Sequence, residues 1–187
     1  MFLKQFNKMS QLTTDIIIMK GAPATGKTQT AKELAKLFPR GVRIEIDNLR
    51  SMVISVDWIN QDEHIRILNI STQLVKEFSD LNYKPIIIVD TFSGDKINAY
   101  YDKLKLLNKD WQISVFGLYA SDNEIAKRLD LRSDDKFKDF EICKKLNNDT
   151  VIFRHKKEVQ LDTSNLTAKE TASIIYEILT KTNIITK

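Results

Sequence analysis

The octapeptide Gly21-Ala-Pro-Ala-Thr-Gly-Lys-Thr28 holds the residues of this chain most clearly arranged for chemistry. It matches G-x-x-x-x-G-K-[ST], a pattern in which backbone N–H groups wrap an anion and the following helix adds the partial positive charge of its N-terminus. In such a loop the lysine reaches the outer phosphates of a nucleotide and the threonine hydroxyl binds Mg²⁺. The pattern predicts a site for ATP and Mg²⁺ formed by Gly21, Ala22, Ala24, Thr25, Gly26, Lys27, Thr28 and Gln29.

Polar side chains follow two other apolar runs of the chain. Asp47 and Arg50 come after residues 42–46, and Asp90 comes after residues 86–89. Because ligands of open α/β sheets bind beyond the carboxyl ends of the strands, we expect these side chains to meet the phosphate loop. Asp47 could orient an acceptor hydroxyl and take its proton, or it could simply cap a helix. Arg50, three residues further on, could bind a negative group of the acceptor or face solvent.

Asp90, Arg128 and Arg132 are candidates for contacts with the metal and the phosphates. Asp90 could hold Mg²⁺ through a water, contact the acceptor, or cap the turn of residues 91–94. Arg128 and Arg132 are four residues apart, so a helix through both would present them on one side. Positive charge there would stabilise the transferring phosphoryl group, although a basic helix end facing water would give the same pattern.

Several other residues have simpler explanations. His64 and His155 are each expected to be solvated polar side chains, and Cys143 is expected to be a small buried apolar one. Met52 and Trp58 follow Arg50 in an apolar stretch that suits either a small-molecule pocket or, more commonly, the core. A single cysteine also excludes an intramolecular disulfide.

Strands and helices alternate along the chain in a way that positions these residues. Four runs rich in β-branched residues predict strands at 16–18, 42–46, 86–89 and 113–119, and a fifth strand is expected at 158–162. Helical spacing and the capping boxes at 121–124 and 167–170 predict the helices between and after them. We expect an α/β doubly wound domain over residues 15–187, an N-terminal extension at 1–14, and a lid or surface helix within 131–148.

The bulk composition sets weaker limits. Hydrophobic residues make up 42% of the chain, and no apolar run approaches the roughly 20 residues of a membrane span. With no leader-like N-terminus, a cytoplasmic protein is expected. The net charge of +4 is compatible with a nucleic-acid partner but does not argue for one.

Taken together, these motifs resemble the small phosphate-loop kinases, and especially the polynucleotide 5′-hydroxyl kinases with their relatives, the chloramphenicol phosphotransferases and zeta toxins. The resemblance covers about residues 15 to 180. It implies a three-layer fold with a five-stranded parallel sheet of order 2-3-1-4-5, a short lid, and ATP as donor. By the same resemblance Asp47 is the general base and Arg50 binds the phosphate next to the acceptor hydroxyl. Phe92 stands where the polynucleotide kinases are expected to have a polar residue.

The predicted activity is therefore transfer of the γ-phosphate of ATP to a hydroxyl. The leading acceptor is a 5′-hydroxyl of nucleic acid or nucleotide, and the alternative is a small molecule such as an antibiotic or metabolite. An ATPase switch that hydrolyses ATP to alter a protein contact is a third interpretation, because the same loop serves ATPases and kinases.

Overall fold

The computed structural model describes residues 14–134 and 137–181, so the expected N-terminal extension lies outside the described residues except for Thr14. Its centre is a five-stranded parallel sheet with the order β2-β3-β1-β4-β5, which confirms the predicted topology. The strands are β1 (Ile16–Gly21), β2 (Val42–Glu45), β3 (Ile86–Asp90), β4 (Ile113–Tyr119) and β5 (Glu158–Asp162). All five run the same way, so their carboxyl ends share one edge of the sheet.

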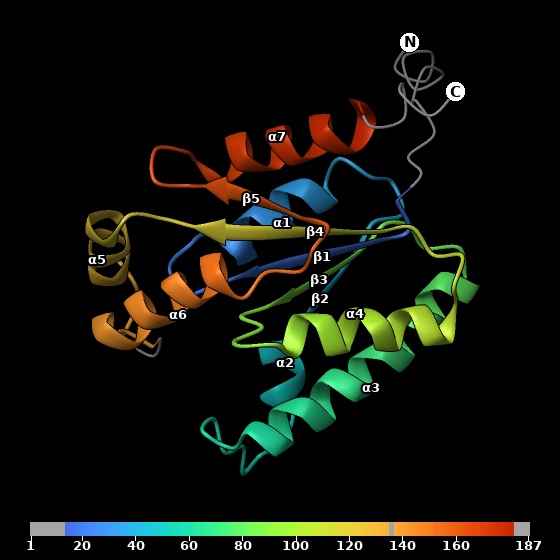
Figure 1. The fold of residues 1–187 in the computed structure, drawn as a ribbon, viewed down its shortest axis with the longest axis horizontal. Coiled ribbons are helices and arrows are strands. Elements are labelled where there is room, and N and C mark those ends of the chain that lie inside the picture. The colour runs from blue at the N-terminus through green and yellow to red at the C-terminus, as the bar shows by residue number, and fades with distance from the viewer. Residues whose placement is uncertain (1–13, 135–136, 182–187) are drawn as a thin grey trace.

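Helices cover both faces of this sheet (Figure 1). They are α1 (Lys27–Ala35), α2 (Ile46–Arg50), α3 (Gln61–Asp80), α4 (Lys96–Leu107), α5 (Asp122–Asp130), α6 (Phe140–Ile152) and α7 (Ala168–Lys181). In Figure 1, α7 and α1 lie on one face, α3 and α4 lie on the other, and α2, α5 and α6 gather towards the carboxyl ends of the strands. The three-layer sandwich expected from the sequence is therefore present.

Alternating side chains of the buried strands fill two separate cores. Ile16 and Ile18 of β1 pack towards α3 and α4, whereas Ile17 and Met19 pack towards α1 and α7. Because helices bury both faces of β1 and β3, these strands have apolar residues at almost every position. This double burial fixes the carboxyl ends of β1 and β3, from which Gly21 and Asp90 enter the site.

Lys20 is a charged exception within β1. Its ammonium lies 3.2 Å from the Glu158 carboxylate of β5 and also donates to the Phe153 carbonyl at the end of α6, and both charged side chains are fully buried. Gly117 of β4 lies between the two strands, and a Cβ atom there would overlap the Glu158 carboxylate. Burial lowers the pKa of Lys20, while the Glu158 charge opposes that shift. The pair ties β5 and α6 to the central strand.

The predicted surface helix and the capping box of α7 are found, whereas the box of α5 is only half formed, because the Ser121 amide donates to Ser164 and not to Glu124. Ser121 Oγ accepts the Glu124 amide at the start of α5, and Thr167 and Glu170 exchange hydrogen bonds at the start of α7. The second half of segment 131–148 forms the start of α6, while residues 135–136 lie outside the described part. No helix in the described ranges is long and apolar enough to cross a membrane.

Candidate active site

The loop between β1 and α1 has the form that phosphate binding requires. Thr25 bonds to the Ala22 carbonyl through its hydroxyl, at 2.9 Å, and through its amide, at 3.4 Å. Gly26 has φ of 88°, a left-handed conformation that glycine adopts without strain, and α1 begins at the next residue. At Gly21 the backbone of Leu118 is so close that a Cβ atom would lie 2.5 Å from its carbonyl oxygen. The two glycines thus allow the loop to close tightly over the helix N-terminus.

Lys27 is the residue of the loop whose pKa responds to the charges of several other predicted site residues. Its ammonium donates to the Ala22 carbonyl at 3.2 Å, which keeps it over the loop. Burial lowers the pKa of Lys27, the charges of Asp47 and Asp90 oppose that shift, and the charge of Arg132 adds to it. Both predicted carboxylates and one predicted arginine are therefore close enough to act on Lys27. Thr28 follows it in the first turn of α1, and Gln29 is exposed.

Arg128 joins α5, the phosphate loop and the segment that follows β5. Its guanidinium bonds to Glu124 in α5 at 2.9 Å, to the Ala24 carbonyl of the phosphate loop at 3.3 Å, and to the Thr163 carbonyl at 2.6 Å. The Thr163 hydroxyl also donates to the Thr25 carbonyl at 3.0 Å. Arg128 and Thr163 consequently brace the loop, and this contact of Thr163 with the loop was not predicted from the sequence.

Arg132 is not on the same helix as Arg128. The expectation of one helix through both arginines is wrong, because α5 ends at Asp130 and Arg132 lies in the connection that follows. Its guanidinium donates to the Phe137 carbonyl at 3.0 Å. Arg132 still acts on Lys27 through its charge, so the two arginines approach the loop from different segments.

Asp47 and Arg50 both belong to the short helix α2, but their surroundings differ. Asp47 is exposed, and its carboxylate makes no hydrogen bond within the described parts of the chain. Arg50 is only 5% exposed, so the interpretation of it as a solvated side chain is wrong. Its Nη2 donates to the Asp57 carbonyl at 3.1 Å, its guanidinium stacks 4.7 Å from the Trp58 ring centre, and its Nε is buried without a partner. Among the described residues no carboxylate forms an ion pair with Arg50.

The connection between α2 and α3 exposes apolar side chains. Trp58 is 50% exposed, and Met52, Ile54 and Ile59 are more exposed still. The common interpretation of Met52 and Trp58 as core residues is therefore wrong. This connection and α2 lie at the end of the molecule to which the strands point, as Figure 1 shows. An apolar surface thus adjoins Arg50 at the edge of the site.

Asp90 is buried and paired with His64, a histidine that was expected to be solvated. Nε2 of His64, from α3, lies 3.1 and 3.2 Å from the two carboxylate oxygens, and the Phe92 amide donates to one of them at 3.0 Å. Burial raises the pKa of Asp90, but the hydrogen bond and charge of His64, the Phe92 amide and Lys27 together hold it below its ordinary value. His64 is 5% exposed, so the expectation of a solvated side chain is wrong. His155 is buried as well, stacked on Tyr101 with ring centres 4.1 Å apart.

Lys96 completes this cluster at the start of α4. Its ammonium lies 3.4 Å from Nδ1 of His64 and 3.1 Å from the Ser93 hydroxyl, and it also donates to Gln61. Burial lowers the pKa of Lys96, the charge of Asp90 opposes that shift, and the charge of Arg50 adds to it. Lys96 and Arg50 are therefore neighbouring cations.

The donor set fits a magnesium ion shared with a nucleotide. Mg²⁺ commonly keeps several waters and is bound through one or two carboxylates and substrate phosphates. The oxygen donors of this set are the Thr28 hydroxyl, in the first turn of α1, and the Asp90 carboxylate, whose charge opposes the lowering of the Lys27 pKa. Within residues 14–134 and 137–181 no group of three or more His, Cys, Asp or Glu could hold a metal by itself.

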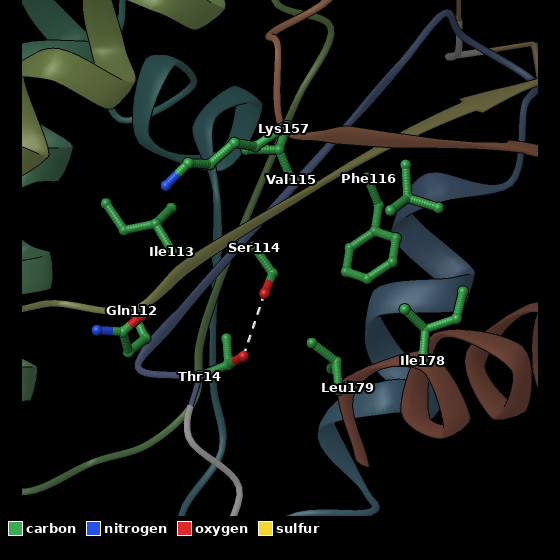
Figure 2. A pocket seen from close by; sticks show the side chains of 10 residues that line it. Thr14, Gln112, Ile113, Ser114, Val115, Phe116, Lys157, Ile178 and Leu179 are labelled. Atoms are coloured by element: carbon green, nitrogen blue, oxygen red, sulfur yellow. Dashed lines mark hydrogen bonds between the residues drawn. The ribbon is translucent and has the colours of Figure 1, made fainter. Parts of the chain in front are cut away.

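A cavity of about 270 Å³ lies elsewhere in the molecule (Figure 2). Its lining includes Thr14, Ser114 and Phe116, and the Thr14 and Ser114 hydroxyls lie 3.1 Å apart. Gln112 and Ser114 are at the amino end of β4, whereas the phosphate loop follows the carboxyl end of β1. The cavity is therefore at the opposite end of the sheet and is not part of the nucleotide site.

Solved structures of kinases and a resistance protein share this fold. A gluconokinase from Sinorhizobium meliloti 1021 is 15% identical with a TM-score of 0.62, over 94% of this chain and 99% of that chain. A tunicamycin resistance protein from Deinococcus radiodurans is 19% identical with a TM-score of 0.58, over 89% and 95%. A chain of the Pnkp1/Rnl/Hen1 RNA repair complex is 20% identical with a TM-score of 0.61, over 79% of this chain and 47% of that chain. Identities this low establish the fold alone.

The fold and the site together are those of a phosphate-loop nucleotide-binding protein, as the sequence motifs predicted. The chain belongs to the AAA_18 family, described as an AAA domain, whose model matches residues 17–150. No curated protein matches the sequence.

Proposed function

We propose that this protein is a kinase that transfers the γ-phosphate of ATP to an acceptor hydroxyl beside Asp47. The observation that carries the proposal is the exposed Asp47 carboxylate of α2, which is unpaired among the described residues and whose charge opposes the lowering of the pKa of the half-buried Lys27. Lys27 would hold the transferring phosphoryl group, and Asp47 would orient the hydroxyl and accept its proton.

The remaining donor-side residues have distinct tasks in this proposal. Thr28 and Asp90 would hold Mg²⁺, which when bound neutralises charge on the β- and γ-phosphates. Arg128 would keep the loop in its binding shape through Ala24, and Arg132 would add positive charge near the γ-phosphate. Residues 131–134, which carry Arg132, would serve as the short lid over the nucleotide.

The acceptor is proposed to carry a negative group near its hydroxyl. Arg50 is nearly buried and unpaired with any described carboxylate, and Lys96 beside it repels it. A buried cation without a counter-ion is costly, so an acceptor phosphate would relieve both the desolvation and the repulsion. This supports a 5′-hydroxyl of a nucleotide or nucleic acid as the leading acceptor. The name of the Pnkp1/Rnl/Hen1 RNA repair complex is consistent with that class.

A small amphiphilic molecule is the second candidate acceptor. The half-exposed Trp58 and the exposed Met52, Ile54 and Ile59 would suit an apolar or aromatic group better than a polynucleotide backbone. The names of the gluconokinase and of the tunicamycin resistance protein are consistent with small-molecule substrates.

The test is transfer of label from γ-labelled ATP to matched acceptors. The panel consists of 5′-hydroxyl RNA and DNA oligomers, nucleosides with and without a 3′-phosphate, gluconate, and phenicol and nucleoside antibiotics. We expect the 3′-phosphorylated nucleoside to be labelled faster than the plain nucleoside. Label that moves only to water would contradict the kinase proposal, and preference for an uncharged apolar acceptor would select the second candidate.

A further inference from the structure

His64 lies within the site but carries no role in the kinase chemistry described so far. It is 5% exposed, comes from α3, and meets Asp90 of β3 across 26 residues of sequence. Both carboxylate oxygens lie about equally far from Nε2, at 3.1 and 3.2 Å. Contact of one nitrogen with both oxygens restricts rotation of the carboxylate about the Cβ–Cγ bond of Asp90. A single hydrogen bond to one oxygen would leave that rotation free.

The partner on the other side of the imidazole determines which nitrogen carries the proton. A lysine ammonium has three donors and no acceptor, so at 3.4 Å from Nδ1 it requires that nitrogen to accept. The proton then resides on Nε2, which donates to Asp90. Lys96 is itself held by Ser93 and Gln61, so its direction is fixed by α4 and α3 together.

We propose that His64 is a positioning residue that holds the Asp90 carboxylate in place, and that Lys96 fixes the imidazole tautomer that does so. The inference rests on the proposed function, because it concerns the orientation of the Asp90 carboxylate toward the Mg²⁺ that would bind with the nucleotide. The Phe92 amide takes one oxygen of Asp90, and His64 supports both. The carboxylate is thereby presented to the phosphate loop in one orientation before any ligand binds. Partners of this kind around metal-binding groups are worth about 10- to 100-fold in metal affinity or activity.

The test measures ATP affinity by calorimetric titration of the full chain, with Mg²⁺ and with chelator. The ratio of the two affinities is the gain due to Mg²⁺. His64→Leu removes the donor, and we expect it to reduce that gain by about 10- to 100-fold while the affinity without Mg²⁺ is unchanged. A merely structural role would lower both affinities together.

Two amides of different length test the geometry. His64→Gln places an amide nitrogen where Nε2 lies and should keep most of the gain, whereas His64→Asn reaches only the position of Nδ1 and should lose it. Because both variants bury a neutral amide, this comparison remains informative if His64→Leu fails to fold. Equal gains for the Gln and Asn variants would overturn the proposal.

Lys96 is tested through its dependence on His64. Lys96→Met should reduce the gain in the wild-type background and have no further effect when combined with His64→Leu, because it acts only through the imidazole. Lys103→Met is the matched control, since Lys103 also links α4 to α3, through Asn69 at 2.6 Å, but away from Asp90. It should leave the gain unchanged. Additive effects of Lys96→Met and His64→Leu would refute the role of Lys96.

These outcomes separate the inference from the proposed function. A wild-type chain that gains no ATP affinity from Mg²⁺ refutes the proposed function and this inference with it. A normal gain that His64→Leu leaves unchanged overturns the inference alone.

Discussion

The phosphate loop is one short stretch of sequence, whereas the rest of the site is assembled from distant elements. Residues 21–28 form the phosphate loop, and its backbone presents the binding groups. In the rest of the site, Asp47 and Arg50 come from α2, His64 from α3, Asp90 from β3 and Lys96 from α4. Phosphate binding by the loop depends on the shape of its backbone. The rest of the site depends on which side chains come together.

This difference has a consequence for specificity. A backbone cradle recognises phosphates whatever residue types surround it, so the same loop serves many reactions. Side chains such as Arg50 and Trp58 can be exchanged without changing the fold, so the acceptor preference should respond to single substitutions there. Substitutions in the loop should affect every acceptor equally.

Lys27→Ala should give the largest loss. Removing the ammonium that faces the transferring phosphoryl group is expected to lower transfer about 10³-fold for every acceptor. The measurement is the initial rate of label transfer with each acceptor. Lys32→Ala, an exposed lysine on the same helix, is the control and should match the wild type. A loss of transfer confined to one acceptor would contradict the view that the phosphate loop serves every acceptor equally.

Asp47→Asn should lower transfer by about 10²-fold while ATP still binds, because the amide cannot accept the hydroxyl proton. Transfer rates and ATP titrations on the same preparation separate the two effects. Asp80→Asn, an exposed aspartate at the far end of α3, serves as the control. Full transfer by Asp47→Asn would show that another group is the base.

Arg50→Ala should change preference more than rate. Loss of a charge-assisted contact is expected to reduce the advantage of a phosphate-bearing acceptor over its uncharged analogue about tenfold. The readout is the ratio of kcat/KM for a nucleoside 3′-phosphate and the plain nucleoside. Equal losses with both acceptors would mean that Arg50 only supports the fold through Asp57 and Trp58.

Trp58→Leu should have the smallest effect, about threefold, because stacking on a half-exposed ring is weak. The effect should appear in KM for the acceptor and leave KM for ATP unchanged. Trp58→Phe keeps an aromatic face and should be milder. An altered KM for ATP would indicate that the α2 and α3 connection belongs to the donor side as well.

The sequence predicted the parts of the molecule that depend on local patterns. The β-branched runs, the capping boxes at 121–124 and 167–170, and the loop from Gly21 to Thr28 each signal their structure within about eight residues. The strand order followed from the resemblance to the phosphate-loop kinases. The position of Asp47 after β2 was likewise expected, although β2 ends at Glu45 and α2 begins at Ile46.

What the sequence could not predict are contacts between distant residues. The partner of His64 is 26 residues away, and that of Thr163 is in the phosphate loop, 138 residues away. A histidine in an otherwise polar helix start carries no sign that it will be buried against a carboxylate. The prediction that Arg132 shares a helix with Arg128 was wrong for a different reason. A spacing of four residues places two side chains on one helix face only if the helix continues through both, and α5 ends at Asp130.

The measurement that tests the central claim most directly is the partition of the γ-phosphate between acceptor and water. ATP labelled in its γ-phosphate is turned over with a saturating 5′-hydroxyl acceptor, and the label in the acceptor is compared with the label in free phosphate. We predict that nearly all of it enters the acceptor, and that Asp47→Asn lowers this transfer without raising hydrolysis. Label that enters only free phosphate, at a rate no hydroxyl compound changes, would contradict the account.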